Sequence, residues 1–299
     1  MVDIKCTVNK KDISKVLIKN LISLEVVDYD GTKADELSIT LSNVIKRPLN
    51  DDKIKLWIDY NFYGTFLVDS TETNYLNLLT ITATSANFSK TLKTKQNRNY
   101  KETSLHKIIN KIAEEHKLKT KIDFEDINYE NIIQEKESDL HFLNRLAEKY
   151  DAIFSIKNDT LLFLKRSENL PTFLIDLNDC FPWSIKHKSR EKYQSCIATW
   201  RDTKYNKNKS VKIGDEEPIL KIDGNYLSES EAMVIAKASL AKSKRGTIEG
   251  NLSKKGEYLS AGSHIQIINS KQDDGVYSLS IVTTTIDKDG FRVKVLLTN

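Results

Sequence analysis

The sequence predicts a mixed α+β fold that is mainly β, with two similar antiparallel β regions separated by a small α/β insert. Three observations carry this prediction. Short alternating apolar segments with polar turns occupy both ends of the chain. Helix-type apolar spacing occurs near the middle. Segments close to the ends of the two β regions also resemble each other. We therefore expect three domains, at residues 1–90, 91–168 and 169–299.

The first region reads as a series of short strands. Leu21–Val27 and Glu36–Leu41 flank a turn-rich segment with Asp30-Gly31 at its centre, which is typical of a hairpin. Regularly spaced short strands with polar turns favour a sandwich or a barrel. The further strands expected here are Lys53–Ile58, Gly64–Val68 and Leu78–Ala83.

The insert is predicted to hold two helices. Thr103 or Ser104 caps the first, which carries an apolar stripe. A loop from Gln134 leads into the second, where Ser138 is suited to be the N-cap and Asp139 places a negative charge at the positive end of the helix dipole. The stripe of the first helix is Leu105, Ile108, Ile109, Ile112 and Ala113, and the strands expected after the second helix are Ala152–Ile156 and Thr160–Leu164.

The closing region returns to β structure, with one helix. Ser228 and Glu231 have the spacing of a capping box, in which each side chain accepts from a backbone N–H of the other residue. Gly246 is suited to end this helix. The strands predicted around it are Tyr193–Trp200, His264–Ile268, Val276–Thr283 and Phe291–Leu297.

An internal repeat is suggested when Gly64 is set on Gly275. Phe66 then falls on Tyr277, Val68 on Leu279 and Ile54 on Ile265, and a one-residue gap sets Leu79 on Phe291. Two unrelated antiparallel sheets remain the alternative. A real repeat would let a trimer present six similar domains in a ring.

Composition restricts the class of protein. The chain has 299 residues and a formal net charge of +4, which is too mild to imply nucleic-acid binding by itself. No apolar run approaches the roughly 18 residues of a membrane-spanning helix, and the N-terminus lacks a secretory h-region. We therefore expect no integral membrane association, and a protein that is made and kept inside a cell or leaves it by another route. The three cysteines are expected to be buried, reduced thiols.

No catalytic, metal or cofactor motif stands out. The five histidines are scattered, and no glycine loop has the spacing that cradles a phosphate. Glu135, Glu137 and Asp139 could be imagined as an acid/base set, but acidic residues at a helix start are explained by the dipole and the cap. We therefore expect no catalytic residue, no metal and no cofactor.

The central segment carries a family resemblance. It reads Q-x-x-E-S-D-x-x-F-L-x-R-L-A-x-x-Y and resembles the signature of baseplate hub proteins of contractile tails, which include phage late-control D proteins and the hub-like part of VgrG spike proteins. Val27-Asp28, Ala34-Asp35, Leu259–Gly262 and Gly275–Tyr277 add weaker matches in the family's order. The signature residues are Gln134, Glu137, Ser138, Asp139, Phe142, Leu143, Arg145, Leu146, Ala147 and Tyr150.

The resemblance implies tube-type antiparallel β-barrel domains and a structural role. Three chains would form a pseudo-sixfold ring that joins a sixfold tail tube to a threefold central spike. The implied partners are two further copies of the chain, the tail tube protein, a separate central spike protein and other baseplate proteins, with the tape-measure protein as a further candidate. A separate spike is expected because the chain ends at Asn299, just after the second β region. The implied location is the baseplate of a virion or phage-tail-like particle, assembled in the bacterial host cytoplasm.

The ten signature residues are predicted to act by packing or at an interface, with their acidic members as cap and surface groups. For Arg145, an internal ion pair and a contact with a neighbouring subunit both stay open. Two rival functions are a tail-associated protein that binds or degrades cell wall, and nucleic-acid binding through the basic stretches Lys93–Lys119 and Lys186–Lys212. The first lacks a catalytic constellation. The second lacks interleaved aromatics in its first stretch, so no specific nucleic-acid binding is expected.

Overall fold

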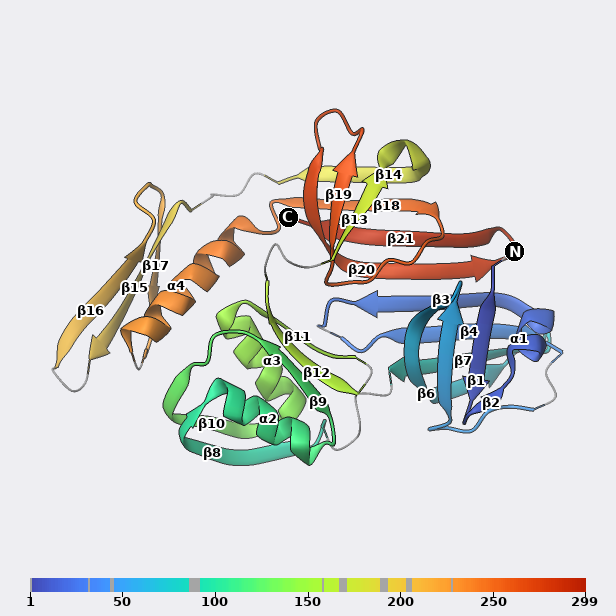
Figure 1. The fold of residues 1–299 in the computed structure, drawn as a ribbon, viewed down its shortest axis with the longest axis horizontal. Helices are drawn as coiled ribbons and strands as arrows, with labels where there is room; N and C mark the ends of the chain where they lie inside the picture. Colours follow the sequence, from blue (N-terminus) through green and yellow to red (C-terminus); the bar gives the residue numbers. More distant parts are fainter. Residues whose placement is uncertain are drawn as a thin grey trace.

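The computed structural model describes most of the chain, and within this part the fold is mainly β with four α-helices (Figure 1). The expected fold class is thereby confirmed. The predicted domain boundaries near residues 90 and 168 lie outside the described residues. Those described are 2–31, 33–43, 46–85, 92–157, 159–166, 171–188, 193–202, 206–226 and 228–299.

The first β region is built from amphipathic antiparallel strands. In β4, Leu37, Ile39 and Leu41 alternate with more exposed residues and are buried, as a half-buried strand requires. The predicted hairpin is confirmed, because Val26 of β3 pairs with Leu37 of β4. The elements are β1 (Ile4–Val8), β2 (Lys11–Asp12), α1 (Ser14–Asn20), β3 (Leu21–Tyr29), β4 (Glu36–Ser42), β5 (Lys53–Ile58), β6 (Asn61–Thr73) and β7 (Leu78–Ser85).

The insert holds the two predicted helices and two small sheets. Gln134–Ser138 forms the end of strand β10, which pairs with β8, so the predicted loop is wrong. Sequence periodicity missed both strands because their residues are almost all polar; in β8 the buried side chains are Tyr100 and Ser104. The elements are β8 (Lys95–Ser104), α2 (Leu105–Glu115), β9 (Lys119–Asp123), β10 (Asn128–Ser138), α3 (Asp139–Tyr150), β11 (Ala152–Lys157) and β12 (Thr160–Lys165).

The two insert helices are capped differently. Ser138 caps α3 as predicted, and its Oγ accepts from His141 N at 3.2 Å. Ser104 stands at the N-cap of α2, but its hydroxyl does not cap the helix. Asp126, which lies outside the helix, caps α2 instead, since its Oδ1 accepts from His106 N at 2.9 Å.

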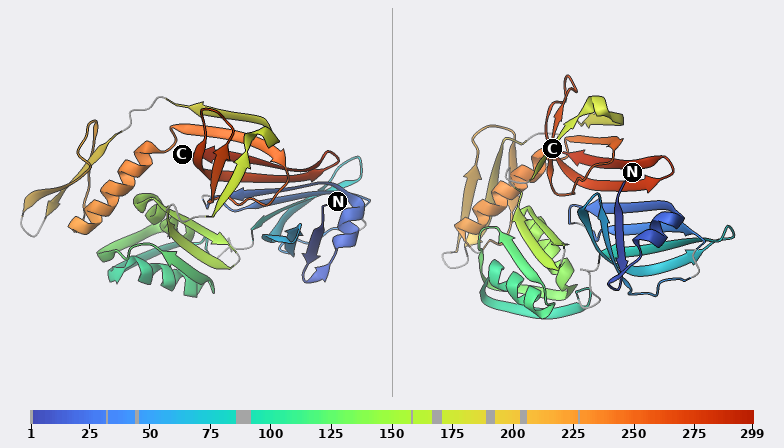
Figure 2. Two further views of the ribbon diagram at one scale, coloured as in Figure 1. Left: turned by 45° about the horizontal axis from the view of Figure 1, so that its top comes forward. Right: turned by 45° about the vertical axis from the view of Figure 1, so that its right-hand side comes forward.

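The closing region is interrupted by a second helix–sheet unit. Helix α4 packs on the sheet β16-β15-β17 and reaches across to α3, so that Ile235 joins the core of the insert (Figure 2). The elements are β13 (Thr172–Asp176), the 3-10 helix η1 (Leu177–Asp179), β14 (Cys180–His187), β15 (Ser195–Asp202), β16 (Lys207–Ile213), β17 (Ile219–Asp223), α4 (Glu229–Lys244), β18 (Ile248–Lys255), β19 (His264–Ile268), β20 (Gly275–Asp287) and β21 (Gly290–Thr298).

Strands β3 and β20 join the two β regions edge to edge. They run side by side in the middle of Figure 1, with Thr284 opposite Val26 and Ile286 opposite Leu24. All four side chains are at most 8% exposed. Within the described residues the ladder therefore runs as an open path from β14 to β2, with β19 and β13 branching from β20, and neither β region closes into a separate barrel.

The internal repeat is confirmed by strand order and register. The first region has the order β5-β6-β7-β4-β3, and the closing region has β19-β20-β21-β18-β14. Ile54 pairs with Phe66, and their predicted counterparts Ile265 and Tyr277 also pair. The two regions are therefore two copies of one supersecondary unit.

Irregularities of the backbone repeat as well. The register of β6 shifts just after Val68, and that of β20 shifts just after Leu279, its predicted counterpart. Val68 N donates to Asp52 O at 3.0 Å, and Leu279 N donates to Ser263 O at 2.9 Å. Bulges are specific features of a ladder, so their shared position strengthens the equivalence.

The last strand of the repeat is shifted from its predicted alignment. Leu79 lies opposite Thr73, and Val293 lies opposite Thr284, the counterpart of Thr73. Leu79 therefore corresponds to Val293 and not to Phe291. A shift of two residues keeps the same strand face buried, so the alternating pattern could not reveal it.

Candidate assembly site

Helix α3 packs the insert through the apolar members of the signature. Each of these side chains is at most 2% exposed, and the ring of Phe142 stacks on Tyr100 with centroids 5.6 Å apart. They belong to a core shared with α2, β11 and β12. The buried signature residues of this face are Phe142, Leu143, Leu146, Ala147 and Tyr150.

Asp139 lies at the centre of a buried polar cluster. Its Oδ1 accepts from Gln134 Nε2 at 2.8 Å and lies 3.2 Å from Arg98 Nη1, while Oδ2 lies 2.8 Å from His116 Nε2. The prediction that Asp139 is a cap or surface group is wrong, because its side chain is fully buried. A buried carboxylate needs partners of this kind, and these tie β8, α2, β10 and α3 together.

Glu137 and Arg145 form a forked ion pair within the chain. Arg145 Nη2 lies 2.5 Å from Glu137 Oε1 and Nε lies 3.2 Å from Oε2; Nη2 also donates to Ile133 O at 3.0 Å. Burial raises the pKa of Glu137, but hydrogen bonds from Arg145 and His141 outweigh it and hold that pKa below its usual value. Of the two roles left open for Arg145, the internal ion pair is therefore present.

Tyr150 connects the signature helix to α4. Its hydroxyl lies 2.8 Å from that of Tyr129 and donates to Glu231 Oε1 at 3.2 Å. Lys149 Nζ lies 2.8 Å from the same carboxylate oxygen. Ser228 caps α4 as predicted, accepting from Glu231 N at 3.1 Å. The role of the Glu231 carboxylate in binding α3 was not foreseen, because nothing in the sequence pairs residues 81 positions apart.

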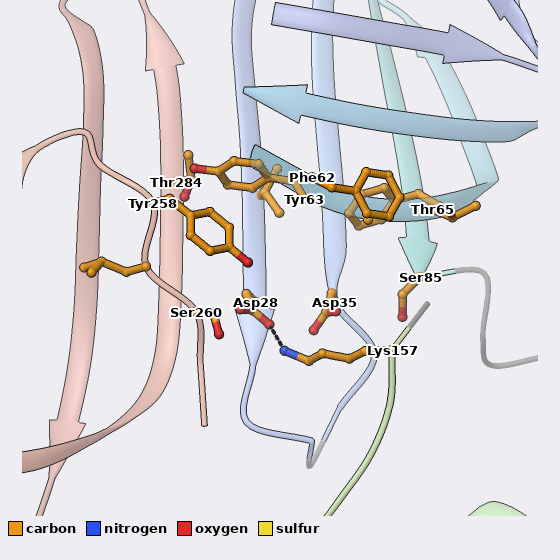
Figure 3. A pocket seen from close by; sticks show the side chains of 14 residues that line it. Asp28, Asp35, Phe62, Tyr63, Thr65, Ser85, Lys157, Tyr258, Ser260 and Thr284 are labelled. Carbon is orange, nitrogen blue, oxygen red and sulfur yellow. Dashed lines mark hydrogen bonds and ion pairs between the residues drawn. The ribbon is translucent and has the colours of Figure 1, made fainter. Parts of the chain in front are cut away.

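A second cluster lies where the insert meets both β regions (Figure 3). Lys157, at the end of β11, points at Asp28 of β3 with Nζ 2.5 Å from Oδ1, and Asp35 lies beside them. Asp28 Oδ2 also accepts from Ala261 N in the closing region at 2.8 Å. We call Asp28, Asp35 and Lys157 the junction cluster.

Charge within the junction cluster is unbalanced, because two carboxylates face one ammonium group. Burial, and then the negative charge of Asp28, raise the pKa of Asp35 to about 7. Burial lowers the pKa of Lys157, but the charges of Asp28 and Asp35 outweigh it and raise that pKa above its usual value.

The junction cluster was not among the predicted site residues. Its carboxylates occur in the Val27-Asp28 and Ala34-Asp35 matches, which could have drawn attention to them. Tyr63 and Tyr258 line the same pocket, with their rings edge to face at 5.4 Å. Burial raises the pKa of Tyr63 to about 12. The arrangement binds chain segments to one another and offers no activated nucleophile.

The described part of the chain holds neither a metal-binding cluster nor a membrane-spanning helix. No group of three or more His, Cys, Asp or Glu side chains there is placed to hold a metal ion. None of the helices in that part has the length and apolarity needed to cross a membrane. The three cysteines are buried and free, as predicted.

Known proteins resemble this chain in sequence and in fold. Residues 68–177, which contain the whole signature, match the family described as "Phage tail baseplate hub (GPD)". The "Probable baseplate hub protein" of Escherichia phage 186 is 29% identical over 262 residues, covering 82% of this chain and 67% of that protein. Its counterpart in Escherichia phage P2 is 28% identical over 220 residues, covering 68% of this chain and 57% of that protein. The chain thus spans only part of the length of these relatives.

Similarity of structure extends over the full chain. The 43 kDa tail protein of prophage MuSo2 from Shewanella oneidensis has a TM-score of 0.76, and the match covers 99% of this chain and 98% of that one at 10% sequence identity. Identity this low shows a shared fold alone. Residues 68–177 are thus similar to the phage tail baseplate hub family, and the two curated relatives that match most of the chain are probable baseplate hub proteins.

Proposed function

We propose that this protein is the structural hub of a contractile phage tail or phage-tail-like particle. Three copies form a ring with pseudo-sixfold symmetry, which joins the sixfold tail tube to a threefold central spike. One observation carries the proposal: a single chain holds two copies of the same β unit, joined edge to edge through β3 and β20. Three such chains supply six similar units, as the symmetry adaptation requires.

The ring has two faces with different partners. One face receives the tail tube protein, and the other receives a separate spike protein together with other baseplate proteins. The protein acts by assembly and carries out no reaction. In the proposed division, residues 1–90 and 169–299 supply the ring units, and residues 91–168 form the insert. The ten signature residues hold the insert together by packing, hydrogen bonds and ion pairs, or act at an interface.

Native mass spectrometry of the purified chain tests the ring. The expected species has the mass of three 34.3 kDa chains. Averaged electron micrographs should show a ring with six similar lobes and threefold symmetry. The same measurements are repeated in the presence of the spike protein. A chain that stays monomeric in both preparations would overturn the proposal.

A further inference from the structure

Strands β6 and β14 each have an edge that no described strand covers. Strand β6 pairs with β5 along Asn61–Leu67 and with β7 along Phe66–Thr73, so Ser70–Thr73 meet no described strand on the β5 side. Strand β14 pairs with β18 and ends the sheet. Such edges are ready to pair with another chain.

The internal repeat indicates which strand belongs on each edge. Strand β6 corresponds to β20, and β14 corresponds to β3. The edge of β20 that corresponds to the free edge of β6 is occupied by β3 of the same chain. The free edges of β6 and β14 belong to one sheet and lie on either side of the β3–β20 junction (Figure 1). A contact between β6 and the β14 of another copy would repeat the β20–β3 contact.

The register of this contact follows from pairs already formed. Val26 lies opposite Leu37 in the first unit, and Ile185 lies opposite Gly250, the counterpart of Leu37, in the second. Ile185 therefore occupies the place of Val26.

Thr73 likewise occupies the place of Thr284 in β20. Since Thr284 lies opposite Val26 and Thr283 lies opposite Val27, the same register sets Thr73 opposite Ile185. It also sets Glu72 opposite Lys186.

We infer that the outer edge of β6 binds β14 of a second copy of this chain in antiparallel register, with Glu72 opposite Lys186 and Thr73 opposite Ile185. The inference rests on the proposed ring and gives its intersubunit contact. Each unit then presents its β3-type strand on one side and its β6-type strand on the other. Repetition of this head-to-tail contact closes a ring when the rotation per unit is suitable.

Charge supports this register. Glu72 and Lys186 are both exposed, and neither lies within 4.0 Å of an oppositely charged group among the described residues; Glu249, opposite Lys186 on β18, pairs with Lys188 instead. Directly opposite residues of an antiparallel pair place their Cβ atoms about 5 Å apart, where opposite charges attract and like charges repel. Shifting the register by one residue would separate the two side chains onto opposite faces.

Exposed apolar surface supports it as well. Trp183 corresponds to Leu24; Trp183 is 42% exposed, whereas Leu24 is fully buried in the contact within the chain. Tyr75, in the turn after β6, is 92% exposed and would lie near Trp183 of the second copy. Leu24 and Ile286 are buried at the internal junction, whereas their counterparts at the two free edges, Trp183 and Tyr75, are exposed apolar residues.

Paired cysteines test the contact. Thr73→Cys combined with Ile185→Cys in the full chain should form disulfide bonds between subunits when the native protein is oxidised. Denaturing, non-reducing electrophoresis should then show a covalent trimer. The matched control combines Thr73→Cys with Lys186→Cys, which lie on opposite faces in this register and should cross-link about tenfold less. The single variants report any contribution from the three buried native cysteines.

Charge exchange tests the same register without a covalent bond. Glu72→Lys and Lys186→Glu should each shift the native mass distribution towards monomer, and the combined exchange should restore the trimer. A wild-type trimer with no selective cross-link, or without recovery in the combined exchange, would overturn this register and leave the proposed ring intact. A wild-type chain that never assembles would overturn both.

Discussion

Lys157 of the insert and Asp28 of the first β region form an ion pair beside the backbone of Ala261, with 2.5 Å between Nζ and Oδ1. Segments far apart in sequence meet at this point. The pair is only partly shielded from water, with side-chain exposures of 27% and 20%. Its main effect is to fix the insert against the contact between the two β regions.

Replacing Lys157 with Met should weaken this attachment. The variant leaves Asp28 and Asp35 facing each other without a cation, and we expect the free energy of unfolding to fall by about 2 kcal/mol. Chemical denaturation at pH 7.5 measures the loss. Lys165→Met is the matched control, because Lys165 lies on the neighbouring strand β12 in an exposed pair 3.8 Å from Glu125. Equal effects of the two substitutions would argue against a special role for Lys157.

Asp35 should make stability depend on pH. Its pKa in the folded protein is about 7, well above the 3.8 of an unperturbed aspartate, so its contribution to stability is full below pH 4 and is lost as pH rises towards and past 7. Asp35→Asn keeps a hydrogen-bond donor and acceptor but cannot ionise. Because the wild-type protein loses this contribution progressively from about pH 4 to pH 7, the substitution should raise stability modestly at pH 5 and by more at pH 8.5.

Thermal unfolding at the two pH values measures this difference. Asp215→Asn provides the control, because the Asp215 side chain is fully exposed and its loss should not change the pH dependence. A benefit of Asp35→Asn that is the same at pH 5 and pH 8.5 would contradict the proposed titration.

Much of the fold could be predicted from local pattern. The hairpin of β3 and β4, the cap of α3 and the paired registers of the repeat follow from alternation, from Ser138 and from the Gly64–Gly275 alignment. Strands β8 and β10 could not be found this way. Among their few apolar side chains, Tyr100, Tyr129 and Ile132 pack in the core shared with α2 and α3, whereas Ile133 is 52% exposed, so no alternating pattern marks these strands.

The site was predicted less completely, for a physical reason. The helical spacing of Leu143 and Leu146 predicts that both side chains are buried. The burial of Asp139 is set by Arg98 and His116, which lie 41 and 23 residues earlier in the sequence. The junction cluster likewise brings Lys157 to Asp28 across 129 residues. Partners of buried charges are chosen by tertiary structure, and a single sequence does not reveal them.

Leu146→Asp should unfold the insert and thereby prevent ring assembly. Leu146 is fully buried in the insert core, so the substitution buries an unpaired carboxylate and should cost more than about 4 kcal/mol. Asn144→Asp adds the same charge at a half-exposed position of α3, where losing the hydrogen bond that Asn144 Nδ2 donates to Glu148 Oε1 should cost only about 1 kcal/mol. Hydrogen exchange of α3 and native mass spectrometry report the two effects. A soluble Leu146→Asp ring of normal mass would refute the packing role.

The forked pair of Glu137 and Arg145 can be separated from a role in assembly by a double-mutant cycle. Glu137→Gln, Arg145→Gln and the double variant should give a coupling energy of about 1 kcal/mol at pH 7, because Arg145 remains 43% exposed.

The pKa of Glu137 is lowered in the folded protein, so this coupling is present above its unperturbed value of 4.5 and should disappear as pH falls below it. Denaturation of the chain at pH 7 and pH 3 measures both values, and native mass spectrometry follows the trimer. If Arg145→Gln abolishes the trimer while Glu137→Gln, with an equal loss of stability, does not, then Arg145 also contacts a neighbouring subunit. Equal behaviour of the two variants would assign Arg145 to the internal pair alone.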